Sequence, residues 1–208
     1  MKSGPISFEK LNCVGHMIPE FGIGNILPPF MGSDAVGAQL PRSPYVATAV
    51  GLVERFCTSP ARATILRGFL AFRAALRDLG FTDGFQWIDG SFVEDCESDR
   101  GRPPNDIDVV SLLVRPVEVR EEAAWGAFIN ENLAAIFTSA TNKQNFHCDS
   151  YFVDLDIEAR EVAEQGAYWF GLFSHQRDTF RWKGLVQIEL VSDDEAAQTL
   201  INEREQGW

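Results

Sequence analysis

Two short polar motifs lie close together in the middle of the chain, each beside an apolar run. Gly90 and Ser91 directly follow the run 85–89, and Asp106 and Asp108 open the run 106–114. Short apolar runs bounded by Gly, Pro and Asn are typical of buried strands. The sequence therefore predicts a strand that ends in a Gly-Ser turn, a polar loop, and a second strand that begins with two carboxylates.

The spacing of the two aspartates allows them to share one face of a strand. Residues i and i+2 of a strand point to the same side, about 6–7 Å apart along the backbone. Two carboxylates in such a position repel each other, and a divalent cation between them removes the repulsion. Mg²⁺ is the favoured ion, with Mn²⁺ as a substitute, because it prefers hard oxygen ligands and shares its coordination shell with phosphate.

The Gly-Ser turn supplies the groups that a phosphate needs. Gly90 has no side chain, so the backbone can approach a phosphate closely. Ser91 offers a hydroxyl and an amide as donors to the same phosphate. Together with the acidic pair, the turn indicates phosphoryl or nucleotidyl transfer.

The arrangement resembles the DNA polymerase beta-like nucleotidyltransferase superfamily. The signature of that superfamily is an apolar residue, Gly, then Gly or Ser, a spacer, and Asp-apolar-Asp. Here the spacer comprises the fourteen residues 92–105, which makes the loop modestly longer than usual. The surrounding segments 87–94 and 104–110 are also similar to a bacterial family of minimal nucleotidyltransferase-like proteins, and that resemblance extends over about residues 20–190.

The resemblance implies a third carboxylate on a later strand. Asp149 is the preferred candidate, because it follows the helix after the second strand; Asp154 and Asp156 are the alternatives. Asp106, Asp108 and Asp149 would then hold two Mg²⁺ ions. The implied reaction moves a nucleoside monophosphate from a nucleoside triphosphate such as ATP to a hydroxyl and releases pyrophosphate.

Two further side chains have open roles. Lys183 is a candidate for contacting the triphosphate together with Gly90 and Ser91, or else it opens an exposed strand end. His147 lies two residues before Asp149 and is expected to face the same side of that strand.

The pattern along the chain predicts an α/β (α+β) domain over residues 45–208, with a small mixed sheet flanked by helices. Residues 1–44 are rich in Gly and Pro and are expected to form an ordered arm over the domain. The predicted strands are 85–89, 106–114, 146–155 and 183–190, and the predicted helices are 46–56, 60–80, 116–137, 156–165 and the last fifteen residues.

Charge and hydropathy limit the partners. The net charge of −12 opposes binding of long nucleic acids, which requires clustered Lys and Arg. No apolar run approaches the ~20 residues of a membrane span, and the first residues lack the apolar core of a signal peptide. We therefore expect a cytoplasmic protein that binds neither membranes nor long nucleic acids.

The acceptor of the reaction is open. A protein side chain or a small molecule is favoured over a nucleic acid end because the chain is small and acidic. Resemblance to small bacterial members of the superfamily points to a cognate protein partner in a toxin–antitoxin or phage-defence pair. The alternative is a non-catalytic interaction module, such as an antitoxin or a subunit, on a degenerate nucleotidyltransferase fold.

Overall fold

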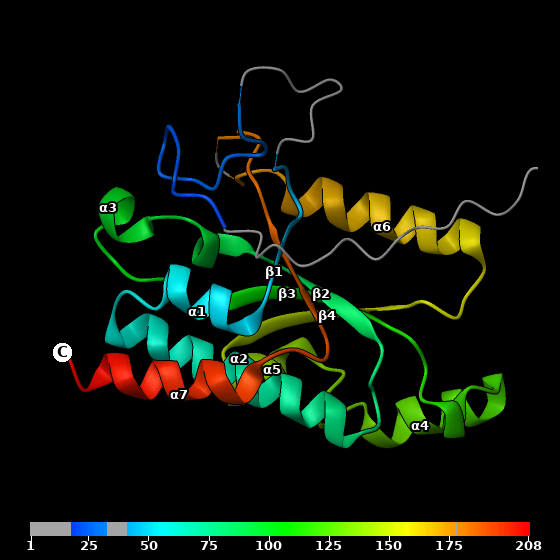
Figure 1. Cartoon of the computed structure of the whole chain (residues 1–208). Coiled ribbons are helices and arrows are strands. Elements are labelled where there is room, and N and C mark those ends of the chain that lie inside the picture. The colour runs from blue at the N-terminus through cyan, green and yellow to red at the C-terminus, as the bar shows by residue number, and fades with distance from the viewer. Residues whose placement is uncertain (1–17, 33–40, 178) are drawn as a thin grey trace, which may run out of the picture.

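The protein is built around one five-stranded mixed sheet with helices on both faces (Figure 1). The computed structural model describes residues 18–32, 41–177 and 179–208. The strands follow one another across the sheet in the order β1-β5-β2-β3-β4. Their bounds are Tyr45–Ala47 (β1), Gly84–Asp89 (β2), Ile107–Leu113 (β3), Cys148–Asp154 (β4) and Val186–Glu189 (β5). The predicted α/β (α+β) class, with a small mixed sheet flanked by helices, is confirmed.

Strand β2 runs antiparallel to both of its neighbours, β3 and β5. The outer pairs, β1 with β5 and β3 with β4, are parallel. A parallel pair needs a crossover between its strands, and the segment between β3 and β4 supplies one that contains α4 (Glu122–Asn132) and α5 (Ser139–Phe146).

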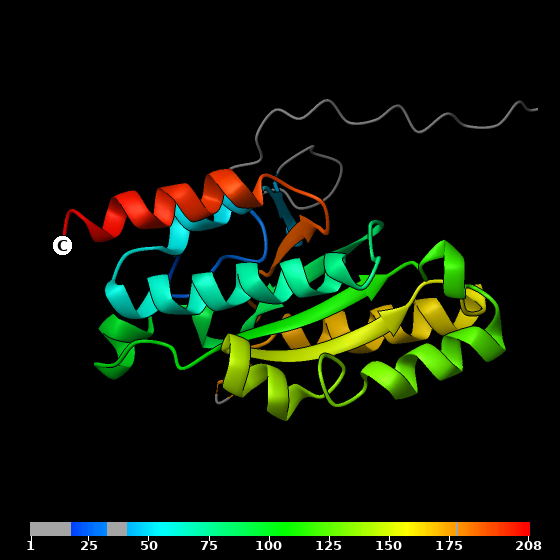
Figure 2. The same cartoon turned by 90° about the horizontal axis from the view of Figure 1, so that it is seen from below.

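One face of the sheet packs against α1 (Ala49–Phe56), α2 (Pro60–Asp78) and α7 (Asp194–Glu205). Figure 2 shows α2 and α7 side by side against this face. Helix α2 begins where the sequence supplies a cap, since Ser59 Oγ accepts a hydrogen bond from the Arg62 amide and Pro60 occupies the first turn. The larger hydrophobic core lies between these helices and the sheet.

The opposite face is covered by α6 (Ala159–Phe173) (Figure 1). Its Trp169 and Phe173 pack on Val110 and Leu112 of β3 and form a second, smaller core. Because side chains alternate along a strand, Asp108 lies on this same face. Helix α6 therefore covers the middle of the face that carries the predicted acidic pair.

Several predicted elements have other bounds in the structure. Val46 lies in β1 and not in a helix, because residues 45–47 pair with β5. The polar loop predicted between the two strands contains the short helix α3 (Cys96–Arg100), which is capped by the Asp95 side chain. The predicted helix 116–137 is shorter, since only η2 (Val117–Val119) and α4 form there, and α5 was not predicted at all.

The described part of the N-terminal arm lies against the domain without forming a helix. Ile26 and Leu27 are buried, and Ile26 makes an isolated bridge to Glu94. Residues 1–17 and 33–40 of the predicted arm lie outside the described residues.

Candidate functional site

Three carboxylates form a row across neighbouring strands of the sheet. Asp89 at the end of β2 pairs in register with Asp108 of β3, and Asp108 pairs in register with Asp149 of β4. Residues paired in register project from the same face of a sheet. Asp106 lies two residues before Asp108, directly ahead of the strand. The acidic row, defined as Asp89, Asp108 and Asp149 with Asp106 at its edge, occupies the α6 side of the sheet.

The Gly-Ser turn lies directly against this row. The 3₁₀ helix η1 (Gly90–Val93) starts where β2 ends, and Gly90 has a φ of 79°, a conformation that favours glycine. A Cβ atom at Gly90 would lie 1.9 Å from Asp108 Oδ2. The absence of a side chain at Gly90 is therefore already required by Asp108, before any ligand is considered. This finding amends the expectation that the glycine serves phosphate approach alone.

Lys143 of α5 is the solvent-exposed cation of the acidic row. Its Nζ lies 2.6 Å from Asp106 Oδ2 and 3.4 Å from Asp149 Oδ2, which places these two carboxylates beside each other. Asp149 also accepts a hydrogen bond from Ser139 Oγ, in the first turn of α5. The Lys143 side chain is 51% exposed, so its ammonium reaches the acids from solvent.

Lys183 is the buried cation of the acidic row. Its side chain is 3% exposed; Nζ donates to Glu94 Oε1 at 2.9 Å and to the Gly90 carbonyl at 3.1 Å. Nζ also forms an ion pair with Asp89 Oδ1 at 3.1 Å, although Oδ1 lacks a partner with hydrogen-bond geometry. The expectation of an exposed strand end is wrong, because Lys183 precedes β5 and is buried. Its ammonium faces three protein oxygens and supports the Gly90 turn from within the fold.

Burial and like charge raise the pKa of two acids of the row, Asp108 and Asp89. Burial, followed by the negative charges of Asp106 and Asp149, raises the pKa of Asp108 to about 6. Burial raises the pKa of Asp89 to about 7, although the Lys183 charge opposes the rise. For Asp149 burial also acts upward, but the hydrogen bond from Ser139 and the charge of Lys143 outweigh it and lower the pKa. The row therefore carries more negative charge than its two lysines balance, and a further cation would be stabilised there.

The two alternatives to Asp149 lie elsewhere. Asp154 Oδ2 accepts from Arg115 Nε at 2.7 Å, and Asp156 Oδ2 accepts from the Arg115 amide at 2.7 Å. Asp154 is the last residue of β4 and Asp156 lies just beyond that strand, five and seven residues after Asp149. Of the three acids considered for a third carboxylate, the fold brings only Asp149 to the pair on β3.

His147 does not face the acidic row. It ends α5 with a φ of 55°, and its Cδ2 lies beside Gly68 of α2. The left-handed conformation interrupts the alternation that the sequence argument assumed, because β4 begins only at the next residue.

Sequence reasoning missed Lys143, Asp89 and Glu94. Asp89 carried a usable signal, since it directly precedes Gly90 and alternates with Trp87 on the predicted strand. Lys143 had none, because α5 is a polar segment without a repeating apolar face.

The donor set of the row fits a hard divalent cation. Asp106, Asp108 and Asp149 supply carboxylate oxygens only, which is the chemistry that Mg²⁺ and Mn²⁺ prefer. As the side chains stand, the described part of the chain has no group of three or more His, Cys, Asp or Glu that could hold a metal ion. Lys143 lies between two of the three acids, so metal binding requires this exposed side chain to move aside.

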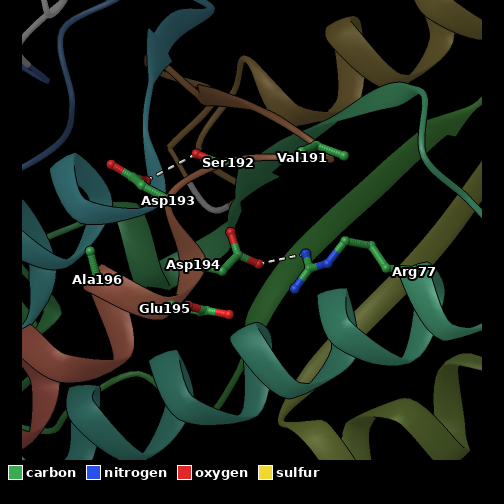
Figure 3. Close-up of a pocket in the computed structure, with 7 residues that line it drawn as sticks. All are labelled: Arg77, Val191, Ser192, Asp193, Asp194, Glu195 and Ala196. Carbon is green, nitrogen blue, oxygen red and sulfur yellow. Dashed lines mark hydrogen bonds and ion pairs between the residues drawn. The ribbon is translucent and has the colours of Figure 1, made fainter.

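A cavity of about 400 Å³ lies away from the acidic row, at the start of α7. Figure 3 shows its lining, in which Arg77 pairs with Asp194 at 2.6 Å. Leu190 directly precedes the lining residue Val191, and its amide donates a hydrogen bond to the carbonyl of Gly84. Gly84 lies at the opposite end of β2 from Asp89. The cavity is therefore separate from the row and shares no residue with it.

The fold and the row define an α/β protein whose mixed sheet gathers carboxylates beside a Gly-Ser turn. Residues 19–189 match a family of unknown function (DUF6932), and the chain belongs to that family. Neither the curated proteins nor the solved structures contain a match to the chain. Among the described residues, no helix is both long enough and apolar enough to cross a membrane.

Proposed function

We propose that this protein is a divalent-metal-dependent nucleotidyltransferase of the DNA polymerase beta-like kind, located in the cytoplasm. One observation carries the proposal. The register of β2, β3 and β4 aligns Asp108 with Asp149 and packs the Gly90 turn against the Asp108 carboxylate. This is the juxtaposition of turn, acidic pair and third acid that the resemblance implies.

In this proposal Asp106, Asp108 and Asp149 would hold two Mg²⁺ ions, and Mn²⁺ could replace them. When bound, the two ions would neutralise the developing charge on the attacking and leaving oxygens. Ser91 follows Gly90 in η1, and its hydroxyl would donate to the terminal phosphates of a nucleoside triphosphate. Lys183 acts on the nucleotide indirectly, by holding the Gly90 carbonyl.

The acceptor is a hydroxyl of a protein side chain or a small molecule. Asp149, on the edge strand β4, is the acid that would orient this hydroxyl. Resemblance to small bacterial members of the superfamily favours a cognate protein partner, in a toxin–antitoxin or phage-defence setting, over a nucleic acid.

A specific observation also favours the second candidate, a non-catalytic interaction module. The Lys143 ammonium already bridges Asp106 and Asp149, and a degenerate site can use such an internal cation permanently. The two candidates differ in one measurable property: the module binds no divalent ion in this row, or binds nucleotide without turnover.

The test is incubation of the full chain with each α-labelled nucleoside triphosphate, Mg²⁺ or Mn²⁺, and cell lysate. The proposal expects a labelled acceptor with wild type, and none with Asp106→Asn or Asp149→Asn. Asp83→Asn is the matched control, because Asp83 is an exposed aspartate outside the row and the substitution removes the same charge. Absence of labelling with every nucleotide and metal, or labelling that survives both row substitutions, would reject the proposed activity.

A further inference from the structure

The two lysines of the acidic row differ in how they are held. Lys183 is 3% exposed and is locked to Glu94, Asp89 and the Gly90 carbonyl. Lys143 is 51% exposed, and within the described part of the chain its ammonium pairs with the carboxylates of Asp106 and Asp149. A buried ammonium bonded on all sides is a permanent part of the fold, whereas an exposed ammonium on a flexible stem can leave at little cost.

The helix that carries Lys143 is firmly placed, although the side chain is not. Asn142, the preceding residue, is fully buried and donates to Ser150 Oγ of β4 at 2.7 Å. His147 then turns the chain directly into β4 through its left-handed conformation. Because the backbone on both sides of Lys143 is fixed, the ammonium is always close enough to return to the acids.

We propose that Lys143 is an exchangeable internal counter-ion, so that its ammonium and a divalent cation occupy the Asp106–Asp149 pair in alternation. The inference rests on the proposed metal site. A Mg²⁺ ion would lie about 2.0–2.1 Å from a carboxylate oxygen, and the ammonium lies 2.6 Å from Asp106 Oδ2. Two cations at such distances from one oxygen repel each other strongly, so the metal displaces Lys143.

This exchange has a functional consequence. In the absence of metal, Lys143 offsets the mutual repulsion of the acids and keeps the row folded. Once displaced, the same ammonium is free at the mouth of the site, where an anionic substrate arrives. Lys143 is thus a positioning residue that sets metal affinity, and it is distinct from the acids that hold the metal.

The test measures Mn²⁺ binding to the full chain by electron paramagnetic resonance, without nucleotide. Lys143→Met should bind Mn²⁺ about tenfold more tightly than wild type, which corresponds to about 1.4 kcal/mol, because the competing cation is gone. Arg160→Met, at an exposed position at the start of α6, removes one positive charge elsewhere and should leave the affinity unchanged. In EDTA, Lys143→Met should melt at a lower temperature than wild type, and saturating Mn²⁺ should abolish that difference.

The outcomes separate this inference from the proposed function. If wild type and Lys143→Met bind Mn²⁺ equally, and Asp106→Asn removes binding, the exchange is wrong and the metal site stands. If Lys143→Met binds more weakly, Lys143 supports the metal and does not compete with it, which also overturns the exchange. If no variant and no wild type binds Mn²⁺, the metal site and the exchange both fail. Lys143→Gln, which also lacks the ammonium but keeps a polar side chain, should bind Mn²⁺ more tightly than wild type, as Lys143→Met does.

Discussion

Asp108→Asn should stabilise the metal-free protein, and the gain should grow with pH. Burial and the neighbouring acids raise the pKa of Asp108 from 3.8 to about 6 in the folded chain. Between these two values the unfolded chain has lost the Asp108 proton and the folded chain still holds it, so the contribution of Asp108 to wild-type stability falls as the pH rises. Asparagine has nearly the same shape and no charge, and it removes this loss.

The magnitude follows from the size of the shift. One pKa unit corresponds to about 1.4 kcal/mol, so ionised Asp108 costs the fold up to about 3 kcal/mol above pH 6. For a chain of this length, each kcal/mol moves the melting temperature by about 2–4 °C. We therefore expect Asp108→Asn to melt about 6–12 °C above wild type at pH 8, and close to wild type at pH 4.

The assay is thermal unfolding in EDTA from pH 4 to pH 8, followed by circular dichroism. Asp83→Asn is the control, and its difference from wild type should stay flat because Asp83 is exposed. Saturating Mg²⁺ should reverse the order, since a ligand of the native state stabilises only the protein that binds it. Equal or lower stability of Asp108→Asn at pH 8 in EDTA would refute the view that the acidic row is electrostatically strained.

Three further predictions concern the turn, its support and the surface. Gly90→Ala should lose at least about 2 kcal/mol of stability in urea titrations, because Gly90 has a positive φ and an added Cβ would clash with Asp108. The control Gly126→Ala, in open space on α4, should gain up to about 1 kcal/mol. Equal effects of the two substitutions would remove the special role of the turn. Lys183→Met should lower the free energy of unfolding by about 3–5 kcal/mol in the same titrations, because it leaves two buried carboxylates without their cation. A variant as stable as wild type would contradict that pairing. The protein should give no gel shift with duplex DNA or mixed tRNA at physiological salt, because its net charge is −12; a micromolar complex with steep salt dependence would make a nucleic acid end the first candidate acceptor.

The local parts of the candidate site could be predicted because each rests on a short sequence pattern. The apolar run before Gly90 and the alternation of Asp106 with Asp108 predicted β2, the turn and β3 within one or two residues. The polar segment 139–146 carries no repeating apolar face, and the helix there was missed together with Lys143. A short polar helix is stabilised by its tertiary contacts, here through Asn142, which local patterns do not reveal.

Pairing partners were beyond the reach of the sequence. No sequence pattern predicts that Asp89 pairs in register with Asp108. Nor does one predict that the ammonium bonded to the Gly90 carbonyl belongs to Lys183, more than ninety residues later. The choice among Asp149, Asp154 and Asp156 also depended on the register of β4, because a shift of one residue would reverse the face of every side chain.

The sequence by itself determined the α/β class, the two motifs and the excess of negative charge, because composition and periodicity are properties of the chain alone. Only the tertiary structure decided which acids meet, which lysine is buried and which is free to move. Those outcomes depend on strand order, register and burial, and they arise when distant segments are packed into one sheet and its two cores.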